Sequence, residues 1–154
     1  VLFLDEPTTG VDAVSRQEFW EMLKSMKTHG ISVFVSTPYM DEAILCDKVA
    51  LIQNGLLLDV DTPDNVISKF EKELLKVKAE DKYLLLQDLR AFEGTEAAYP
   101  FGEYMHVVLN ESYSLKDLEG FLKDKKHINL ELSITNAGIE DRFIQLMDTE
   151  SLEN

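Results

Sequence analysis

Apolar and polar positions in residues 1–70 follow a strand–helix–strand order. Residues 1–5 and 31–37 are short and almost entirely apolar, which is typical of strands covered on both faces in a parallel sheet. Ser15 and Glu18 match a capping box that would open the intervening helix, and Gly30 would end it. The predicted apolar stripe of that helix consists of Phe19, Met22, Leu23 and Met26. This pattern predicts a βαβ unit with parallel strands.

Turn residues then mark a hairpin and two short helices. A helix is expected near residues 41–46, followed by strands at 48–53 and 56–60 on either side of an Asn54-Gly55 turn. Thr62 and Pro63 predict the start of another helix, with threonine as the cap and proline at the first helical position.

Residues 73–149 alternate between strand and helix patterns three times. Alternating apolar residues predict half-buried strands near 75–79, 104–109 and 128–134. Helical spacing is seen around Leu85, around Leu118 and around Phe143, and Ser114 with Asp117 would cap the second of these helices. A sheet with helices on one face is expected, forming a small α+β (βαβαβα) appendage.

Composition excludes several function classes. The 154 residues are 45% hydrophobic and 29% charged, as in soluble globular proteins. A net charge of −14 would repel a phosphate backbone, so no nucleic-acid partner is expected. The longest apolar runs are far shorter than a bilayer span, so direct membrane insertion is not expected either. Cys46 is the one cysteine; it fits a reducing compartment and is expected to pack.

Candidate chemistry lies where the first strand ends. Ligands of open α/β sheets bind beyond the carboxyl ends of the strands, and the first strand delivers Asp5 and Glu6 to that edge. An aspartate there can hold Mg²⁺ through water, and the neighbouring glutamate can orient or deprotonate an attacking water. Such a pair suits phosphoryl transfer. A charged pair that merely closes a strand is the alternative.

Two stretches resemble the ATP-binding subunit of ABC transporters. Residues 2–12, Leu-Phe-Leu-Asp-Glu-Pro-Thr-Thr-Gly-Val-Asp, resemble the Walker B strand and D-loop of that family. Residues 36–43, Ser-Thr-Pro-Tyr-Met-Asp-Glu-Ala, resemble its switch region. The resemblance covers about residues 1–70 and is strongest to the multidrug and antibiotic exporter branch. It implies a partial P-loop NTPase parallel sheet, with ATP and Mg²⁺ as cofactors of a longer parent protein.

The resemblance also implies roles for single residues. Asp5 would serve Mg²⁺ through water, Glu6 would be the catalytic base, and Asp12 would reach across an ATPase dimer. The family normally has a histidine where this chain has Pro38, and that histidine contacts the γ-phosphate. Proline offers neither a side-chain donor nor a backbone N–H, so this switch position is expected to be degenerate. His29 and His106 are expected to be surface or partly buried residues rather than substitutes.

Two family motifs are absent from the 154 residues: the glycine-rich phosphate loop with its lysine, and the signature loop. Because the chain also begins with Val1 inside an apolar strand, the expectation is a fragment that is inactive alone. A second resemblance, carried by residues 99–107 and 138–144, is to the C-terminal extension of exporter ATPases. That extension is read as a packing brace, with a regulatory module as the alternative.

The sequence thus predicts three parts: residues 1–72, the C-terminal half of an ABC ATPase domain; 73–149, an α+β extension; and 150–154, a tail. By resemblance, the partners would be a second ATPase domain and membrane-spanning transporter subunits, on the cytoplasmic face of the cell membrane. Two other functions stay open. One is a non-transport ABC ATPase, which the acidity of the chain disfavours, and the other is a non-catalytic regulatory or interaction module.

Overall fold

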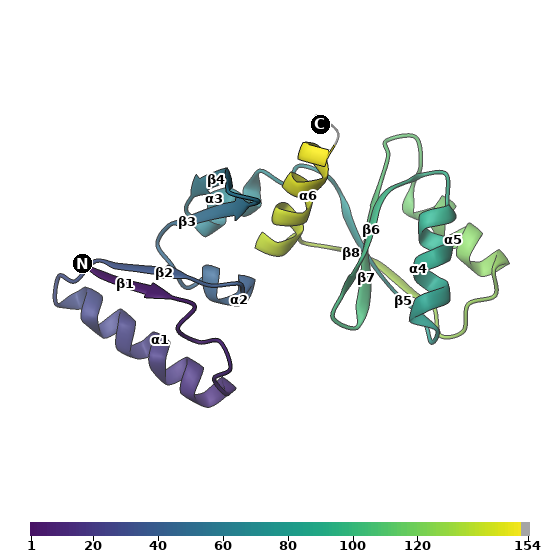
Figure 1. The fold of residues 1–154 in the computed structure, drawn as a ribbon. Coiled ribbons are helices and arrows are strands. Elements are labelled where there is room, and N and C mark those ends of the chain that lie inside the picture. Colours follow the sequence, from purple (N-terminus) through teal and green to yellow (C-terminus); the bar gives the residue numbers. More distant parts are fainter. Residues whose placement is uncertain (152–154) are drawn as a thin grey trace. The chain divides into compact units, whose positions relative to one another are not determined.

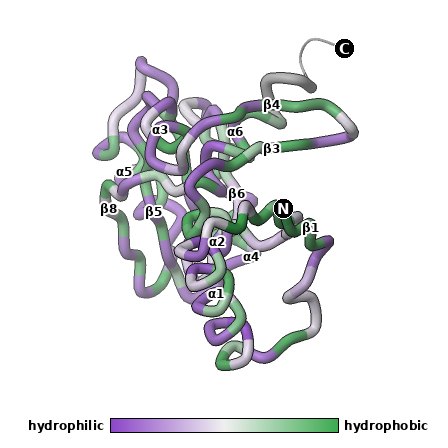
Figure 2. Tube along the Cα trace, turned by 90° about the vertical axis from the view of Figure 1, so that its left-hand side faces the viewer, coloured by the Kyte–Doolittle hydropathy of each residue, from purple (hydrophilic) through white to green (hydrophobic). Residues whose placement is uncertain are grey.

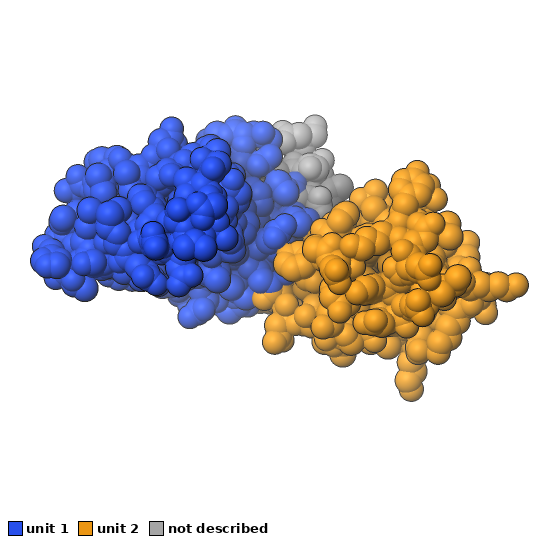
Figure 3. Space-filling view, turned by 90° about the horizontal axis from the view of Figure 1, so that it is seen from below, with its two compact units in different colours: residues 1–69, 138–154 blue, residues 70–137 orange. Residues whose placement is uncertain are grey.

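The computed structural model describes residues 1–151, with side chains described as far as Met147. These residues group into two compact units. Unit 1 comprises Val1–Lys69 together with the chain from Gly138 onward, and unit 2 comprises Phe70–Ala137; Figure 3 colours them separately. The mixture of a small parallel sheet with antiparallel sheets gives a mixed α/β architecture.

Unit 1 opens with the predicted βαβ unit. Strands β1 (Leu2–Asp5) and β2 (Val33–Ser36) pair in parallel, and helix α1 (Ala13–Thr28) connects them and runs beside them in Figure 1. The predicted burial on both faces is wrong, because alternate residues of these strands are exposed; the side chain of Phe3 is 73% exposed. Among the described residues, β1 and β2 form a sheet of only two strands.

Helix α1 differs from its prediction at its start and on its buried face. It begins at Ala13 with Asp12 as the N-cap, so the predicted capping box at Ser15 and Glu18 is wrong. Of the predicted stripe, Leu23 is buried, Phe19 and Met26 are half-buried, and Met22 is exposed. Trp20, which was not in the predicted stripe, is buried as well. Gly30 ends the helix as expected, with a φ of +80° that favours glycine.

The predicted hairpin and the helix after it are confirmed. Helix α2 (Met40–Ala43) leads to β3 (Val49–Gln53) and β4 (Leu56–Asp61), which are antiparallel and joined by Asn54-Gly55 with positive φ at both residues. Helix α3 (Pro63–Ser68) has Thr62 as its cap and proline at its first position. Figure 2 shows hydrophobic colouring along much of both hairpin strands.

Helix α6 (Ile139–Ser151) belongs to unit 1, although its sequence position had placed it with the predicted 73–149 extension. The reason is packing: Ile139 shares a buried cluster with Val49, Leu51 and Val66 of β3 and α3. The predicted tail at 150–154 overlaps the end of α6, and residues 152–154 lie outside the described residues.

Unit 2 is a four-stranded antiparallel sheet with two helices. In chain order it contains β5 (Leu74–Lys78), α4 (Lys82–Ala91), β6 (Thr95–Phe101), β7 (Tyr104–Leu109), α5 (Leu115–Asp124) and β8 (Glu131–Thr135). The spatial order β6-β7-β5-β8 with a βαββαβ sequence is the ferredoxin-like arrangement. The sequence prediction missed β6 and therefore the second hairpin.

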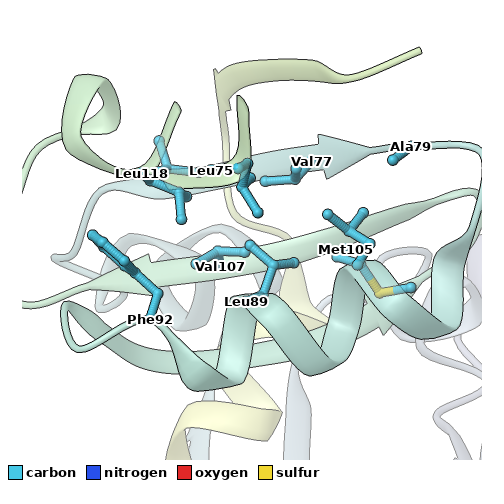
Figure 4. Packing of buried hydrophobic residues seen from close by; sticks show 10 residues of the cluster. Leu75, Val77, Ala79, Leu89, Phe92, Met105, Val107 and Leu118 are labelled. Atoms are coloured by element: carbon cyan, nitrogen blue, oxygen red, sulfur yellow. The ribbon is translucent and has the colours of Figure 1, made fainter. Parts of the chain in front are cut away.

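The core of unit 2 lies between the sheet and the helices α4 and α5. Figure 4 shows Leu89 of α4 and Phe92, the residue that ends this helix, facing Val107 and Met105 of β7. Leu89, Val107 and Leu118 are fully buried. The capping box of Ser114 and Asp117 at the start of α5 is confirmed. One helix-covered sheet face was predicted, and this core confirms it.

Candidate functional site

The carboxyl ends of β1 and β2 meet at one edge and are joined by Ser36. Asp5 lies opposite Ser36 in the strand register. The Ser36 hydroxyl donates to Asp5 Oδ1 at 2.5 Å and accepts from the Glu6 backbone N–H at 3.0 Å. A second hydrogen bond runs from Glu6 N–H to the Ser36 carbonyl at 3.1 Å. The pair Asp5-Glu6 and the segment that follows β2 are therefore fixed beside each other.

Glu6 turns the chain sharply at the end of β1. Its φ is +43°, a left-handed conformation that non-glycine residues seldom adopt and that clusters at functional sites. The Thr9 hydroxyl donates to Glu6 Oε2 at 3.2 Å, which helps to orient the exposed carboxylate. Asp5 and Glu6 are both exposed, so solvent or a ligand can reach them in unit 1.

Asp12 is held by its own helix. Its Oδ1 accepts hydrogen bonds from Val14 N–H (3.0 Å) and Ser15 N–H (3.1 Å), and its Oδ2 accepts from the Ser15 hydroxyl (2.7 Å). The backbone N–H and then the hydroxyl of Ser15 hold the pKa of Asp12 below its usual value. The carboxylate is exposed and charged, and its N-cap role limits how far it can move.

Pro38 is exposed in the segment between β2 and α2. Its neighbours are anchored on both sides, because Thr37 Oγ1 accepts from Tyr39 N–H at 3.1 Å and the guanidinium of Arg16 lies 4.4 Å from the centre of the Tyr39 ring. Pro38 thus lies between two residues with defined contacts, yet proline supplies no side-chain donor there.

A buried carboxylate connects the loop after β1 with the segment after β2. Glu42 on α2 is 1% exposed, and its Oε2 accepts from Thr8 Oγ1 at 3.0 Å and from Thr37 Oγ1 at 2.6 Å. Its Oε1 lies 3.5 Å from Nε of Arg16 on α1. These four residues, Thr8, Arg16, Thr37 and Glu42, are called the Glu42 cluster below.

The sequence did not predict the Glu42 cluster. A glutamate next to Asp41 on a short helix is expected at the surface, since glutamate is seldom buried unless paired. Its partner Thr8 lies 34 residues away, so local spacing holds no sign of the contact. Ser36 was also missed as a bridge. The only hint was that Ser36 and Thr37 are polar residues that end an apolar strand.

The donor set at the edge fits one side of a magnesium–nucleotide site. Carboxylate and hydroxyl oxygens are hard ligands, and Mg²⁺ is usually bound by one or two carboxylates together with waters and phosphate oxygens. Asp5 and Ser36 offer such oxygens. Among the described residues, no group of three or more His, Cys, Asp or Glu side chains could hold a metal by itself. A metal at this edge would therefore need ligands supplied by the nucleotide or water.

The remaining candidate residues have structural surroundings. Cys46 is half-buried against the β3–α6 cluster, and burial, followed by the charges of Asp47 and Glu42, raises the pKa of its thiol. His29 caps the C-terminus of α1, and the His106 ring in β7 stacks on Phe101 at a centroid distance of 4.0 Å. No described helix is long and apolar enough to cross a membrane.

Comparison with curated proteins identifies relatives of the chain. It is 48% identical over 66 residues to the probable multidrug ABC transporter ATP-binding protein YbhF of Escherichia coli, covering 43% of this chain and 11% of that protein. It is 30% identical over 153 residues to the Nod factor export ATP-binding protein I of Burkholderia lata, covering 97% of this chain and 48% of the relative.

The chain is a homologue of ABC transporter ATP-binding proteins. A further relative, the daunorubicin resistance ATP-binding protein DrrA2 of Streptomyces coeruleorubidus, is 28% identical over 152 residues, covering 95% of this chain and 47% of the relative. The chain thus spans about half the length, or less, of these ABC relatives. No family model matches it. This homology to the drug-resistance and Nod-factor export branch confirms the resemblance and implies a P-loop type of fold for part of the chain.

Proposed function

We propose that residues 1–72 form the C-terminal half of the ATP-hydrolysing domain of an ABC exporter. Residues 73–149 are then its C-terminal extension, whose last helix, α6, packs on β3 and α3 of unit 1. The observation that carries the proposal is the bridge made by Ser36, which joins Asp5 and Glu6 to the segment leading to Pro38. The two carboxylates and Pro38 follow the carboxyl ends of parallel strands, and nucleotides bind at that edge in α/β folds, which supports the proposal.

Asp5 and Glu6 have different tasks in this proposal. Asp5 would hold Mg²⁺ through water, and the bound metal would neutralise phosphate charge. Glu6 acts as general base toward the attacking water. Two observations support this division. Asp5 accepts a hydrogen bond from the Ser36 hydroxyl on Oδ1. The direction of the Glu6 side chain is set by its left-handed backbone and by a hydrogen bond from the Thr9 hydroxyl.

Asp12 contributes to a site shared between two ATPase domains in this proposal. It is exposed at the N-terminus of α1, where a charged carboxylate can reach another domain. Pro38 occupies the position of the γ-phosphate contact. A site without that contact closes over ATP and hydrolyses it slowly, because losing a positioned catalytic group typically costs about 10²–10⁴-fold in rate.

The whole protein would act with a second ATPase domain and with membrane-spanning subunits, at the inner face of the cell membrane. The name of the Nod factor export relative supports an export role, and the multidrug transporter and daunorubicin resistance names agree with it. The net charge of −14 disfavours ribosome-bound ABC ATPases. Unit 2 has a buried core of its own, which supports its assignment as an extension separate from the ATPase domain.

Titration calorimetry with MgATP tests this assignment. Residues 1–154 contain no glycine-rich loop followed by lysine, so the chain alone should bind MgATP negligibly. The complete protein that carries the chain should bind it, and Asp5→Asn should weaken the magnesium-dependent part of that binding. Sub-millimolar binding by the 154-residue chain, displaced by ADP, would contradict the proposal.

A further inference from the structure

Glu42 lies where the two functional segments of unit 1 come together. Thr8 lies in the loop between Glu6 and Asp12, and Thr37 directly precedes Pro38. Hydroxyls from both segments donate to the same oxygen, Glu42 Oε2. A movement of either segment relative to Glu42 therefore lengthens a hydrogen bond to a carboxylate that the other segment also holds.

Arg16 extends this connection to α1. Its Nε lies 3.5 Å from Glu42 Oε1, and neither of these buried atoms has a hydrogen-bond partner. The guanidinium also lies over the Tyr39 ring, and the Arg16 backbone N–H donates to the Asp12 carbonyl at 2.9 Å. Arg16 therefore connects the start of α1, which Asp12 caps, with Tyr39 through its ring contact and with Thr37 through Glu42.

Burial makes this arrangement sensitive to small changes. A buried carboxylate is costly unless it is paired and hydrogen-bonded, so Glu42 has few alternative positions. Its side chain is 2% exposed, and water cannot readily replace a lost partner. Two packed segments that share one such group have coupled positions.

We propose that Glu42 is a positioning residue that couples the loop carrying Glu6 and Asp12 to the switch segment around Pro38. It does not touch the reacting atoms. Its part in catalysis rests on the function proposed above, whereas the coupling itself is a property of unit 1. Through the Glu42 cluster, a change at the switch segment alters how the D-loop is held, and the reverse also applies.

Hydrogen exchange on the 154-residue chain tests the coupling directly. Thr8→Val should speed exchange of the Tyr39 amide, which donates to Thr37, by about 10-fold. Reciprocally, Thr37→Val should speed exchange of the Val11 amide, which donates to the Thr8 carbonyl. Thr9→Val is the matched control, because Thr9 donates to Glu6 and not to Glu42. It should leave Tyr39 unchanged.

The role of Glu42 itself is tested in a second background. With Glu42→Met, which removes both acceptors, Thr8→Val should no longer change Tyr39 exchange. The proposal is overturned if Thr8→Val still speeds Tyr39 exchange in the Glu42→Met background. It is also overturned if Thr8→Val and Thr37→Val, each made alone, leave the exchange of Tyr39 and Val11 unchanged. If Glu42→Met does not fold, the reciprocal pair of threonine variants decides.

The catalytic consequence is measured in the complete protein carrying Pro38→His, the form expected to hydrolyse ATP well. There Glu42→Gln should lower kcat about 10-fold with little change in KM, whereas Glu18→Gln on the exposed face of α1 should change neither. Unchanged kcat in Glu42→Gln overturns the catalytic part. If Pro38→His itself gives no gain, the proposed function fails, while the exchange result still decides the coupling.

Discussion

Replacing Thr8 by valine removes one hydroxyl from the Glu42 cluster without opening a cavity, because a methyl group takes its place. Thr8 is 1% exposed and donates to Glu42 Oε2 at 3.0 Å. A hydrogen bond to a charged group contributes about 1.5–3 kcal/mol, and leaving a buried acceptor unpaired costs a similar amount. Thr37 still donates to the same oxygen, so we expect the free energy of unfolding to fall by about 1.5 kcal/mol, the lower end of this range.

Urea denaturation followed by tryptophan fluorescence measures this loss. Trp20 is the single tryptophan, is 6% exposed, and lies on α1 in the same unit as Thr8. The midpoint should fall with the m-value unchanged. Thr9→Val is the control, since Thr9 is exposed and its loss should cost less than about 0.5 kcal/mol. Equal effects of the two substitutions would refute the stabilising role of the buried hydrogen bond.

Three further predictions concern capping, the unit 2 core and the thiol. Asp12→Ala should speed hydrogen exchange of the Ser15 amide, which donates to Asp12, whereas Asp12→Asn should not. Because the pKa of Asp12 is lowered in the folded chain, the stabilisation by this carboxylate is present above about pH 4 and is lost as the pH falls through the folded pKa. Acid unfolding of the wild type should therefore show this loss, and acid unfolding of Asp12→Ala should not. Leu89→Ala should destabilise unit 2 by about 3 kcal/mol, whereas the exposed Leu84→Ala on the same helix should cost less than about 0.5 kcal/mol, as measured by exchange of the β5 and β7 amides. Because burial raises the pKa of the Cys46 thiol, a thiol reagent at neutral pH should label it faster in urea than in the folded chain, and equal rates would contradict this.

Elements with strong local signals could be predicted from the sequence. The Asn54-Gly55 turn, the Thr62-Pro63 start of α3 and the Ser114 capping box each depend on residues within a few positions of one another. The parallel pairing of β1 and β2 also followed, because two apolar runs joined by one helix favour that geometry.

Elements decided by tertiary structure could not be predicted. Strand β6 contains Pro100 and lacks a clean alternation of apolar residues; its place at the sheet edge allows the proline. At the start of α1, the sequence offers two good N-cap residues, Asp12 and Ser15. The structure uses Asp12, which follows the turn at Gly10. Helix α6 joins unit 1 although its sequence neighbours belong to unit 2.

The candidate site divides in the same way. Asp5, Glu6, Asp12 and Pro38 were found because they form contiguous motifs, and their functional roles stay predictions. The bridge by Ser36 and the hydrogen bond from Thr8 to the buried Glu42 join residues thirty or more positions apart, which no local pattern records.

The most direct test of the central claim is single-turnover ATP hydrolysis by the complete protein, with any complete partner site disabled. Pro38→His should raise hydrolysis at this site by about 10²-fold or more, and Glu6→Gln should abolish that gain in the double variant while barely changing the site that keeps Pro38. If Glu6→Gln removes substantial hydrolysis with Pro38 still in place, or if Pro38→His gives no gain, the assignment of Glu6 as base beside a degenerate switch is contradicted.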